Sequence, residues 1–131
     1  MDNRPHAPTS HVLVVEDDRD LAELMSWVLQ SAGFDVTTAY NGRTGLAALE
    51  RSPNSVVVLD LMMPDVDGVE FRARQQSVPA TSAAPVLIVS ARHDAAAVAA
   101  TLGVAGFLPK PFAPEELVDA VSRIALRRQE S

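Results

Sequence analysis

The stretch SVVVLDLMMP, residues 55–64, has an apolar side chain at every position from Val56 to Leu59. A strand with one solvent face alternates polar and apolar residues, whereas a parallel strand covered on both faces is apolar throughout. Asp60 follows this run directly and places a carboxylate at its carboxyl end. We therefore expect a buried strand over residues 55–59 that ends at an acidic side chain.

Outward from this stretch, short apolar runs alternate with segments of helical periodicity. The first helical segment, residues 20–32, carries apolar residues at helical spacing, namely Leu21, Leu24, Met25, Val28 and Leu29. Gly33 then ends this helix, and Asn41 and Asp94 are typical N-cap residues for later ones. We expect strands at residues 12–15, 34–39, 55–59, 86–89 and 106–108. We expect helices at residues 20–32, 42–51, 69–76 and 95–102, with a last helix from residue 114 onward.

Strict alternation of five strands and five helices predicts an α/β fold, with a doubly wound parallel sheet and helices on both of its faces. Ligands of such sheets bind beyond the carboxyl ends of the strands, so the chemistry is expected there. We expect one domain over residues 11–128, with short tails at residues 1–10 and 129–131.

Composition excludes several classes of function. The chain has 131 residues, a net charge of −6 and no cysteine. Disulfides, thiol catalysis and thiolate metal sites are thereby excluded, and the acidic balance argues against direct nucleic-acid binding. No apolar run reaches the roughly 20 residues that cross a bilayer, and residues 1–10 lack the apolar core of a secretory signal. We expect a cytoplasmic protein that does not contact a membrane.

The residues at the strand ends are acidic, hydroxylic or cationic. Glu16, Asp17 and Asp18 follow the first strand, Asp60 ends the third, Ser90 ends the fourth, and Lys110 follows the fifth. Two carboxylates a few Å apart repel by ~4 kcal/mol at an effective dielectric constant of about 20, so such a cluster raises its pKa values or holds a cation. Oxygen ligands alone suit Mg²⁺, or Mn²⁺ as a second choice. A carboxylate beside such an ion can attack phosphorus, while a lysine and a hydroxyl bind the phosphoryl oxygens.

Each of these residues also has a purely structural explanation. Asp17 or Asp18 can cap the following helix, and Asp60 can favour the turn that leads to Pro64. Ser90 or Lys110 alone is a weak signal. The setting Pro109-Lys110-Pro111 predicts a rigid exit from the fifth strand, where an X-Pro bond is a candidate for the cis form.

Together these residues resemble the receiver domain of bacterial two-component response regulators, over residues 11–127. The motifs are Val14-Val15-Glu16-Asp17, Val58-Leu59-Asp60-Leu61-Met62-Met63-Pro64, Asp67-Gly68, Ser90-Ala91 and Phe107-Leu108-Pro109-Lys110-Pro111-Phe112. Their common order and spacing make the resemblance specific. It implies a flavodoxin-like (βα)5 fold with strand order 2-1-3-4-5.

The resemblance also implies roles for individual residues. Asp60 matches the phosphoacceptor, and Lys110 matches the lysine that binds the phosphoryl group. Asp17, Asp60 and the backbone carbonyl of Met62 match the direct Mg²⁺ ligands, with Glu16 acting through water. Ser90 and Phe107 match the pair that switches when the domain is phosphorylated. No organic cofactor is implied.

On this basis we expect a phosphoacceptor signalling switch of a phosphorelay rather than a metabolic enzyme, one that only assists its own phosphorylation and dephosphorylation. The partners implied are a histidine kinase or histidine phosphotransfer protein. A downstream effector is expected on the face formed by the fourth helix, fifth strand and fifth helix. The resemblance is compatible with a monomer or a phosphorylation-dependent dimer.

Two alternatives come from other classes. A phosphorylation-independent interaction module would keep the fold, but it would not need the whole set of site residues. A phosphatase with an aspartyl nucleophile usually has a second Asp two residues later, where this chain has Met62. The chain also departs from the family pattern at Arg72 and Gln75, which replace aliphatic core residues, so we expect a weak third helix. The alanine-rich fourth helix predicts a small output face.

Overall fold

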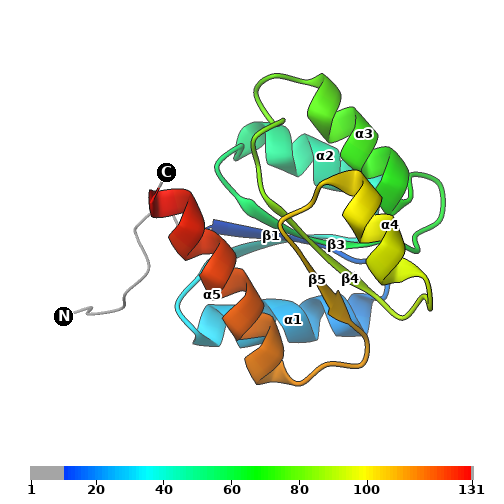
Figure 1. Cartoon of the computed structure of the whole chain (residues 1–131). Helices are drawn as coiled ribbons and strands as arrows, with labels where there is room; N and C mark the ends of the chain where they lie inside the picture. Colours follow the sequence, from blue (N-terminus) through cyan, green and yellow to red (C-terminus); the bar gives the residue numbers. More distant parts are fainter. Residues whose placement is uncertain (1–10, 131) are drawn as a thin grey trace.

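The computed structural model describes residues 11–130, without the side chains of residues 129 and 130, and shows a sheet flanked by helices (Figure 1). The strands are β1 (His11–Val15), β2 (Asp35–Ala39), β3 (Val56–Asp60), β4 (Val86–Ser90) and β5 (Gly106–Pro109). The helices are α1 (Arg19–Ser31), α2 (Gly42–Arg51), α3 (Gly68–Ser77), α4 (Ala95–Leu102) and α5 (Pro114–Glu130). The expected tail at residues 1–10 lies outside the described residues, and α5 continues to Glu130, past the expected domain end at residue 128.

All strand pairs are parallel, and the strands lie in the order β2-β1-β3-β4-β5. The predicted α/β class, the flavodoxin-like topology and the strand order are confirmed. The register pairs Val15 with Leu59, and Asp60 with Val89. The residues that follow β1, end β3 and end β4 therefore meet at one edge of the sheet.

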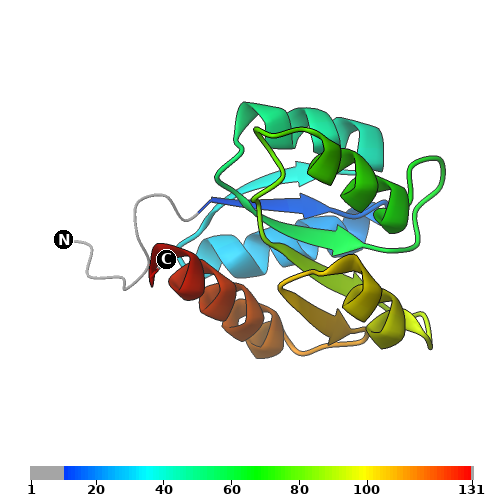
Figure 2. The ribbon, with the colours of Figure 1, turned by 45° about the horizontal axis from the view of Figure 1, so that its top comes forward.

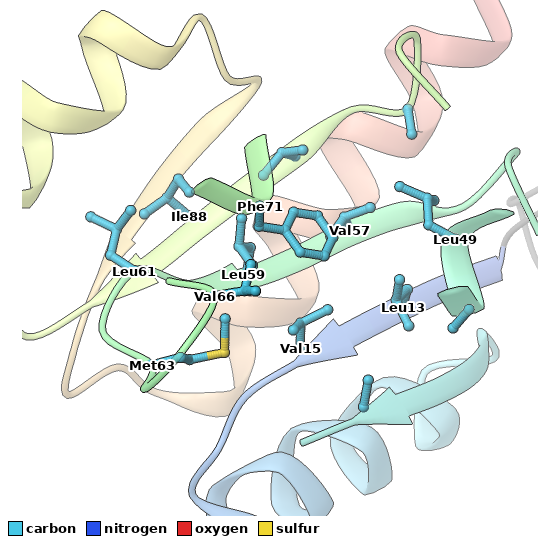
Figure 3. Packing of buried hydrophobic residues seen from close by; sticks show 14 of the residues in the cluster. Leu13, Val15, Leu49, Val57, Leu59, Leu61, Met63, Val66, Phe71 and Ile88 are labelled. Carbon is cyan, nitrogen blue, oxygen red and sulfur yellow. The ribbon is translucent and has the colours of Figure 1, made fainter. Parts of the chain in front are cut away.

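Helices cover both faces of the sheet, α1 and α5 on one and α2, α3 and α4 on the other (Figures 1 and 2). The side chains of β3 alternate between two buried clusters. Val57 and Leu59 face the α2–α4 side, and Val56 and Val58 face the α1–α5 side. This division explains why the strand is apolar at every position. Figure 3 shows the α2–α4 side, where Phe71 lies among strand side chains.

The helix boundaries follow from capping residues. The carboxylate of Asp18 accepts a hydrogen bond from the Leu21 amide at 3.2 Å and so begins α1. Asn41 and Asp67 cap α2 and α3 in the same way. Gly33, which follows α1, has a φ of 102°, in the left-handed region that glycine adopts without strain. Asp18 is therefore the cap, which leaves Glu16 and Asp17 as the acidic pair.

Two expectations about helices are wrong. Asp94 occupies the N-cap position of α4, but its carboxylate makes no capping hydrogen bond because it pairs with the Arg92 guanidinium. Leu24 belongs to the predicted apolar face of α1, yet it is 53% exposed. Met25 and Leu29 of that face are buried as predicted, and Ala22 is buried as well.

Helix α3 is longer and better anchored than its sequence suggests. It runs over ten residues and buries Arg72 and Gln75 at the positions where aliphatic residues were expected. Both side chains are hydrogen-bonded, so the helix is not weakened by unpaired polar atoms.

Candidate functional site

Three carboxylates converge at the carboxyl edge of the sheet. Glu16 and Asp17 follow β1, and Asp60 ends the neighbouring strand β3. One carboxylate oxygen from each residue lies within 4.8 Å of the others. Glu16 and Asp60 are buried, whereas Asp17 is exposed, so the cluster opens to solvent on the Asp17 side.

Lys110 brings the opposite charge into this cluster. It is the only lysine of the chain and follows β5 directly. Its Nζ donates to Glu16 Oε1 at 2.7 Å and lies 3.6 Å from Asp60 Oδ2. The Lys110–Pro111 peptide bond is cis, as the Pro-Lys-Pro setting suggested. Three carboxylates face one ammonium group, so the site has an excess of negative charge.

Backbone amides also hold the acidic side chains, and the sequence analysis did not identify them. The Met62 amide donates to Asp60 Oδ1 at 3.1 Å, and the Asp18 amide donates to Glu16 Oε2 at 3.2 Å. Every residue except proline carries an amide, so no residue pattern marks these two donors. They orient the carboxylates without adding a charge.

Burial raises the pKa of Glu16 from 4.5 to about 7. The hydrogen bond from Lys110 opposes this rise, and the charge of Asp60 adds to it. A carboxylate buried beside another one binds a proton more readily than it does in water. A cation in the cluster would compete with that proton and favour the charged form.

Ser90 lies on β4, the strand beside Asp60, and Phe107 lies on β5, one strand further from the acidic cluster. Ser90 ends β4 one residue beyond Val89, the partner of Asp60, and its hydroxyl accepts a hydrogen bond from the Arg92 amide at 3.1 Å. Phe107 pairs with Ile88 across β4 and β5 and packs, partly buried, against the α2–α4 side.

The donor set suits a hard divalent cation. All three clustered side chains offer carboxylate oxygens, and no histidine is among them. Such ligands favour Mg²⁺ or Mn²⁺ over zinc or copper. The excess negative charge attracts a cation, and the exposure of Asp17 leaves the cluster accessible from solvent. The cluster is therefore consistent with the metal site of a receiver domain.

Comparison with known proteins identifies the family. The family model for the response regulator receiver domain matches residues 12–122. The CpxR homolog of Haemophilus influenzae, a transcriptional regulatory protein, is 40% identical over 124 residues, which are 93% of this chain and 52% of that protein. The sensory transduction protein RegX3 of Mycolicibacterium smegmatis is 35% identical over 119 residues, 89% of this chain and 50% of that protein. The chain thus spans about half the length of these curated relatives.

Solved structures agree. The chemotaxis protein CheY4 of Vibrio cholerae matches with a TM-score of 0.81 and 30% identity, over 88% of this chain and 98% of that one. The receiver domain of the Francisella response regulator 1452 matches with a TM-score of 0.80 and 30% identity, over 91% of this chain and 98% of that one.

The chain belongs to the response regulator receiver domain family of two-component systems. It is a signal-transduction module and not a classical enzyme. None of its described helices is long and apolar enough to span a membrane.

Proposed function

We propose that this chain is a phosphoacceptor switch, phosphorylated on Asp60 by a histidine kinase or histidine phosphotransfer protein in the presence of Mg²⁺. The observation that carries the proposal is the cluster of Glu16, Asp17 and Asp60 within 4.8 Å, with the ammonium group of Lys110 3.6 Å from Asp60. A carboxylate, a cation and an acidic metal cluster are the parts that phosphoryl transfer to an aspartate needs.

In the proposed reaction an oxygen of Asp60 forms a bond to phosphorus as the phosphorus–nitrogen bond of the partner's phosphohistidine breaks. The partner's imidazole leaves with the electron pair of that bond. Lys110 exchanges its contact with Glu16 for a phosphoryl oxygen, and the Ser90 hydroxyl donates a hydrogen bond to another phosphoryl oxygen. Asp17, Asp60 and the Met62 carbonyl would hold Mg²⁺ directly, with Glu16 acting through water, and the ion would neutralise charge on the phosphoryl oxygens. Water later attacks the acyl phosphate and restores Asp60.

The output is proposed to follow from Ser90 and Phe107. Ser90 moves toward the phosphoryl group, Phe107 fills the space it leaves, and the face of α4, β5 and α5 changes its affinity for an effector. In physical terms, the phosphoryl group shifts the populations of two packings. We place this switch in the cytoplasm, as a monomer or a phosphorylation-dependent dimer that does not itself contact nucleic acid.

The central test is phosphorylation of Asp60. Wild-type protein with Mg²⁺ and acetyl phosphate should gain one phosphoryl group by intact mass spectrometry, and beryllofluoride should shift the NMR resonances of Ser90 and Phe107. Asp60→Asn should abolish both responses. Asp67→Asn is a matched control, because Asp67 lies in the same loop and asparagine can also cap α3. Phosphate incorporation by the Asp60→Asn protein would show that the acceptor is another residue.

An apolar hollow beside Lys110 supports a protein as phosphoryl donor. It has a volume of about 400 Å³ and lies between α1 and the segment that enters α5, with Leu24 and Phe112 in its lining. Leu24 is 53% exposed and offers apolar surface to a partner at the lining of this hollow. We propose that a helix of the histidine-bearing partner covers this hollow, because its phosphohistidine must reach Asp60 past Lys110.

Substitution of Leu24 separates a protein donor from a small one. Leu24→Asp should slow phosphorylation by the phosphorylated partner by about tenfold or more, since a charge would face an apolar partner surface. Phosphorylation by acetyl phosphate should stay at the wild-type rate. Leu126→Asp is the control, because Leu126 is 46% exposed but does not line the hollow. Equal effects of Leu24→Asp on both donors would contradict this docking site.

The alternative, a phosphorylation-independent interaction module, makes the opposite prediction. Its partner would bind equally well to wild-type protein and to the Asp60→Asn variant, with or without beryllofluoride. The intact set of charged residues at the sheet edge favours the phosphoacceptor.

A further inference from the structure

The loop between β3 and α3, residues 61–67, is anchored on the α2 side of the sheet. Leu61, Met63 and Val66 are buried, at 2%, 7% and 1% exposure, whereas Met62 is 58% exposed. Figure 3 shows Val66 and Met63 pointing into the cluster that contains Val15 and Phe71. These anchors fix the course of the loop, and with it the Met62 amide that donates to Asp60 Oδ1.

Helix α2 lies against this loop at a helix residue that carries no side chain. Gly42 is the first residue of α2. A Cβ atom added to it would lie 2.5 Å from the carbonyl oxygen of Val66 and 2.8 Å from its Cγ1. Real Cβ atoms do not approach backbone this closely, so any residue other than glycine would displace either the loop or the start of the helix.

The base of the loop is closed by a second glycine, Gly68, which also lies in close contact with backbone atoms. The Gly68 amide donates to the Leu61 carbonyl at 3.0 Å. A Cβ atom on Gly68 would lie 2.7 Å from Leu61 Cα and 2.9 Å from the carbonyl oxygen of Asp60. The loop is therefore held at its base by Gly68 and, two residues before that glycine, at Val66 by Gly42. Because the base is closed at Gly68, a displacement of Val66 is expected to move the other side of the loop, toward Met62 and Asp60.

An ion pair at the rim is a weaker third link. Arg43 donates to Asp65 at 2.8 Å, but both side chains are about two-thirds exposed. Exposed pairs contribute little because water screens them. The close contact at Gly42, and not this ion pair, is the stronger constraint on the loop.

We propose that Gly42 is a positioning residue for the phosphoacceptor site. By carrying no side chain, it lets Val66 rest directly on α2 and so keeps the Met62 backbone and the Asp60 carboxylate in the geometry that binds the metal ion. The inference deepens the proposed function and rests on it. It assigns to α2, which contributes none of the clustered acids, a share in the affinity of the site for Mg²⁺.

The test compares two alanine substitutions in the same helix. Gly42→Ala places a methyl group against the loop, whereas Gly45→Ala places one 2.9 Å from Val15 Cγ2 and 3.1 Å from Phe71 Cε2, in the core. Gly42→Ala should raise the Mg²⁺ dissociation constant by about tenfold or more, the usual effect of disturbing the groups that orient metal ligands. Gly45→Ala should stay within about twofold of wild type, because it does not touch the loop. Mg²⁺ titration followed by NMR measures both constants.

Two further measurements separate positioning from general destabilisation. Phosphorylation of Gly42→Ala by acetyl phosphate should recover toward the wild-type rate at saturating Mg²⁺, since the reacting groups are all present. In metal-free protein, the Met62 amide resonance should shift in Gly42→Ala and not in Gly45→Ala. Arg43→Ala should leave the Mg²⁺ dissociation constant within about twofold of wild type, because the exposed pair is weak.

Equal Mg²⁺ dissociation constants for Gly42→Ala and Gly45→Ala would overturn the inference. If Gly42→Ala does not fold, Val66→Ala replaces it, with Val57→Ala as control, since both valines are buried in the same cluster and only Val66 lies in the loop. The same difference in Mg²⁺ affinity is then expected, and its absence overturns the inference. Failure of wild-type protein to bind Mg²⁺ or accept phosphate would instead refute the proposed function, and the metal-free Met62 resonance would still decide whether Gly42 positions the loop.

Discussion

Lys110 has two electrostatic roles that act in opposite directions. In the structure it neutralises part of the charge of Glu16 and Asp60, at 2.7 and 3.6 Å. That contact stabilises the cluster but competes with any cation that binds there. In the proposed reaction the same ammonium group binds a phosphoryl oxygen, so it would hinder the metal ion and assist the chemistry.

Lys110→Ala should separate these roles. Loss of the ammonium group should tighten Mg²⁺ binding by about fivefold, or ~1 kcal/mol after solvent screening. The rate of phosphorylation by acetyl phosphate should fall by about a hundredfold, because the transferred group loses its cationic partner. Isothermal titration calorimetry and mass spectrometry measure the two effects. Weaker Mg²⁺ binding in Lys110→Ala would mean that Lys110 supports the metal site and does not compete with it.

His11 provides a pH-dependent contribution far from the sheet edge. Its ring lies between Ser55 Oγ at 2.6 Å and Thr37 Oγ1 at 2.8 Å, and so bridges β1 to β2 and to the residue before β3. Burial lowers the pKa of His11 below 6.5, although the charge of Asp35 opposes this. The unfolded chain therefore takes up a proton near pH 6.5 that the folded ring resists. The stability that His11 contributes is complete above that pH and declines below it.

Comparison with His11→Gln isolates this contribution. The wild-type protein should have the higher Tm at about pH 8, and the difference from His11→Gln should shrink as the pH falls below 6.5. The acids of the metal cluster titrate in both proteins, so their effect cancels in the difference. His93→Gln, in an exposed loop, controls for the histidine-to-glutamine change itself. A difference that widens at low pH would mean that the folded state prefers the charged ring.

At the scale of elements, α3 shows how a polar residue can serve as part of a core. Arg72 donates to the carbonyl groups of Leu102 and Gly103, which lie at the C-terminal end of α4, and to Gln75. Gln75 in turn donates to the carbonyls of Thr81 and Ala84. Gln75 thereby satisfies two buried backbone carbonyls, and Arg72 satisfies two partly buried ones. They connect α3, α4 and the loop before β4.

Arg72→Met should therefore destabilise the protein by ~2–4 kcal/mol in urea denaturation, because it leaves the buried Gln75 Oε1 and two partly buried backbone carbonyls without this donor. Hydrogen exchange should accelerate most in α4, whose last carbonyls lose their partner. Arg74→Met is the control on the same helix. Arg74 is half-exposed and pairs with Glu70 one turn away, so its loss should cost about 0.5 kcal/mol or less. Equal costs for the two variants would mean that the contacts of Arg72 with α4 contribute little.

The sequence predicted helices and strands well where residues close together in the chain determine them. The apolar runs of β1, β3 and β4, the caps Asn41 and Asp18, and the glycine after α1 depend on neighbours along the chain. The polar network of Arg72 could not be predicted, because its acceptors are backbone carbonyls some 30 residues away that have no residue signature. The tight contact of Gly42 with Val66 is equally long-range. Leu24 was misassigned because helical periodicity does not tell which apolar side chain the sheet covers.

For the whole molecule, the arrangement of strands creates a local conflict between stability and function. The order β2-β1-β3-β4-β5 brings the ends of β1 and β3 together, so Glu16, Asp17 and Asp60 share one edge. Burial raises the pKa of Glu16, and the charge of Asp60 adds to that rise, so the cluster is costly to keep charged in the folded protein. Without a cation, the stability of the rest of the fold must offset the cost of keeping these carboxylates together. Strained or charged sites of this kind are typical of functional centres, where stability is lower than the fold would allow.

Asp17→Asn tests this conflict on the whole protein. Removal of one clustered charge should raise the Tm of metal-free protein by a few degrees, because less repulsion remains in the folded state. Mg²⁺ should stabilise the wild type by about 2.7 kcal/mol at a hundredfold excess over its dissociation constant, and it should stabilise Asp17→Asn far less.

Asp18→Asn removes the same charge one residue later, and asparagine can cap α1 as aspartate does. It should therefore keep the full Mg²⁺ response, since Asp18 is not a member of the cluster. Calorimetric scans with EDTA and with Mg²⁺ give both quantities for each protein. If Asp17→Asn lowered the Tm without metal, or if both variants responded to Mg²⁺ alike, the repulsion would lie elsewhere and Asp17 would not be a ligand.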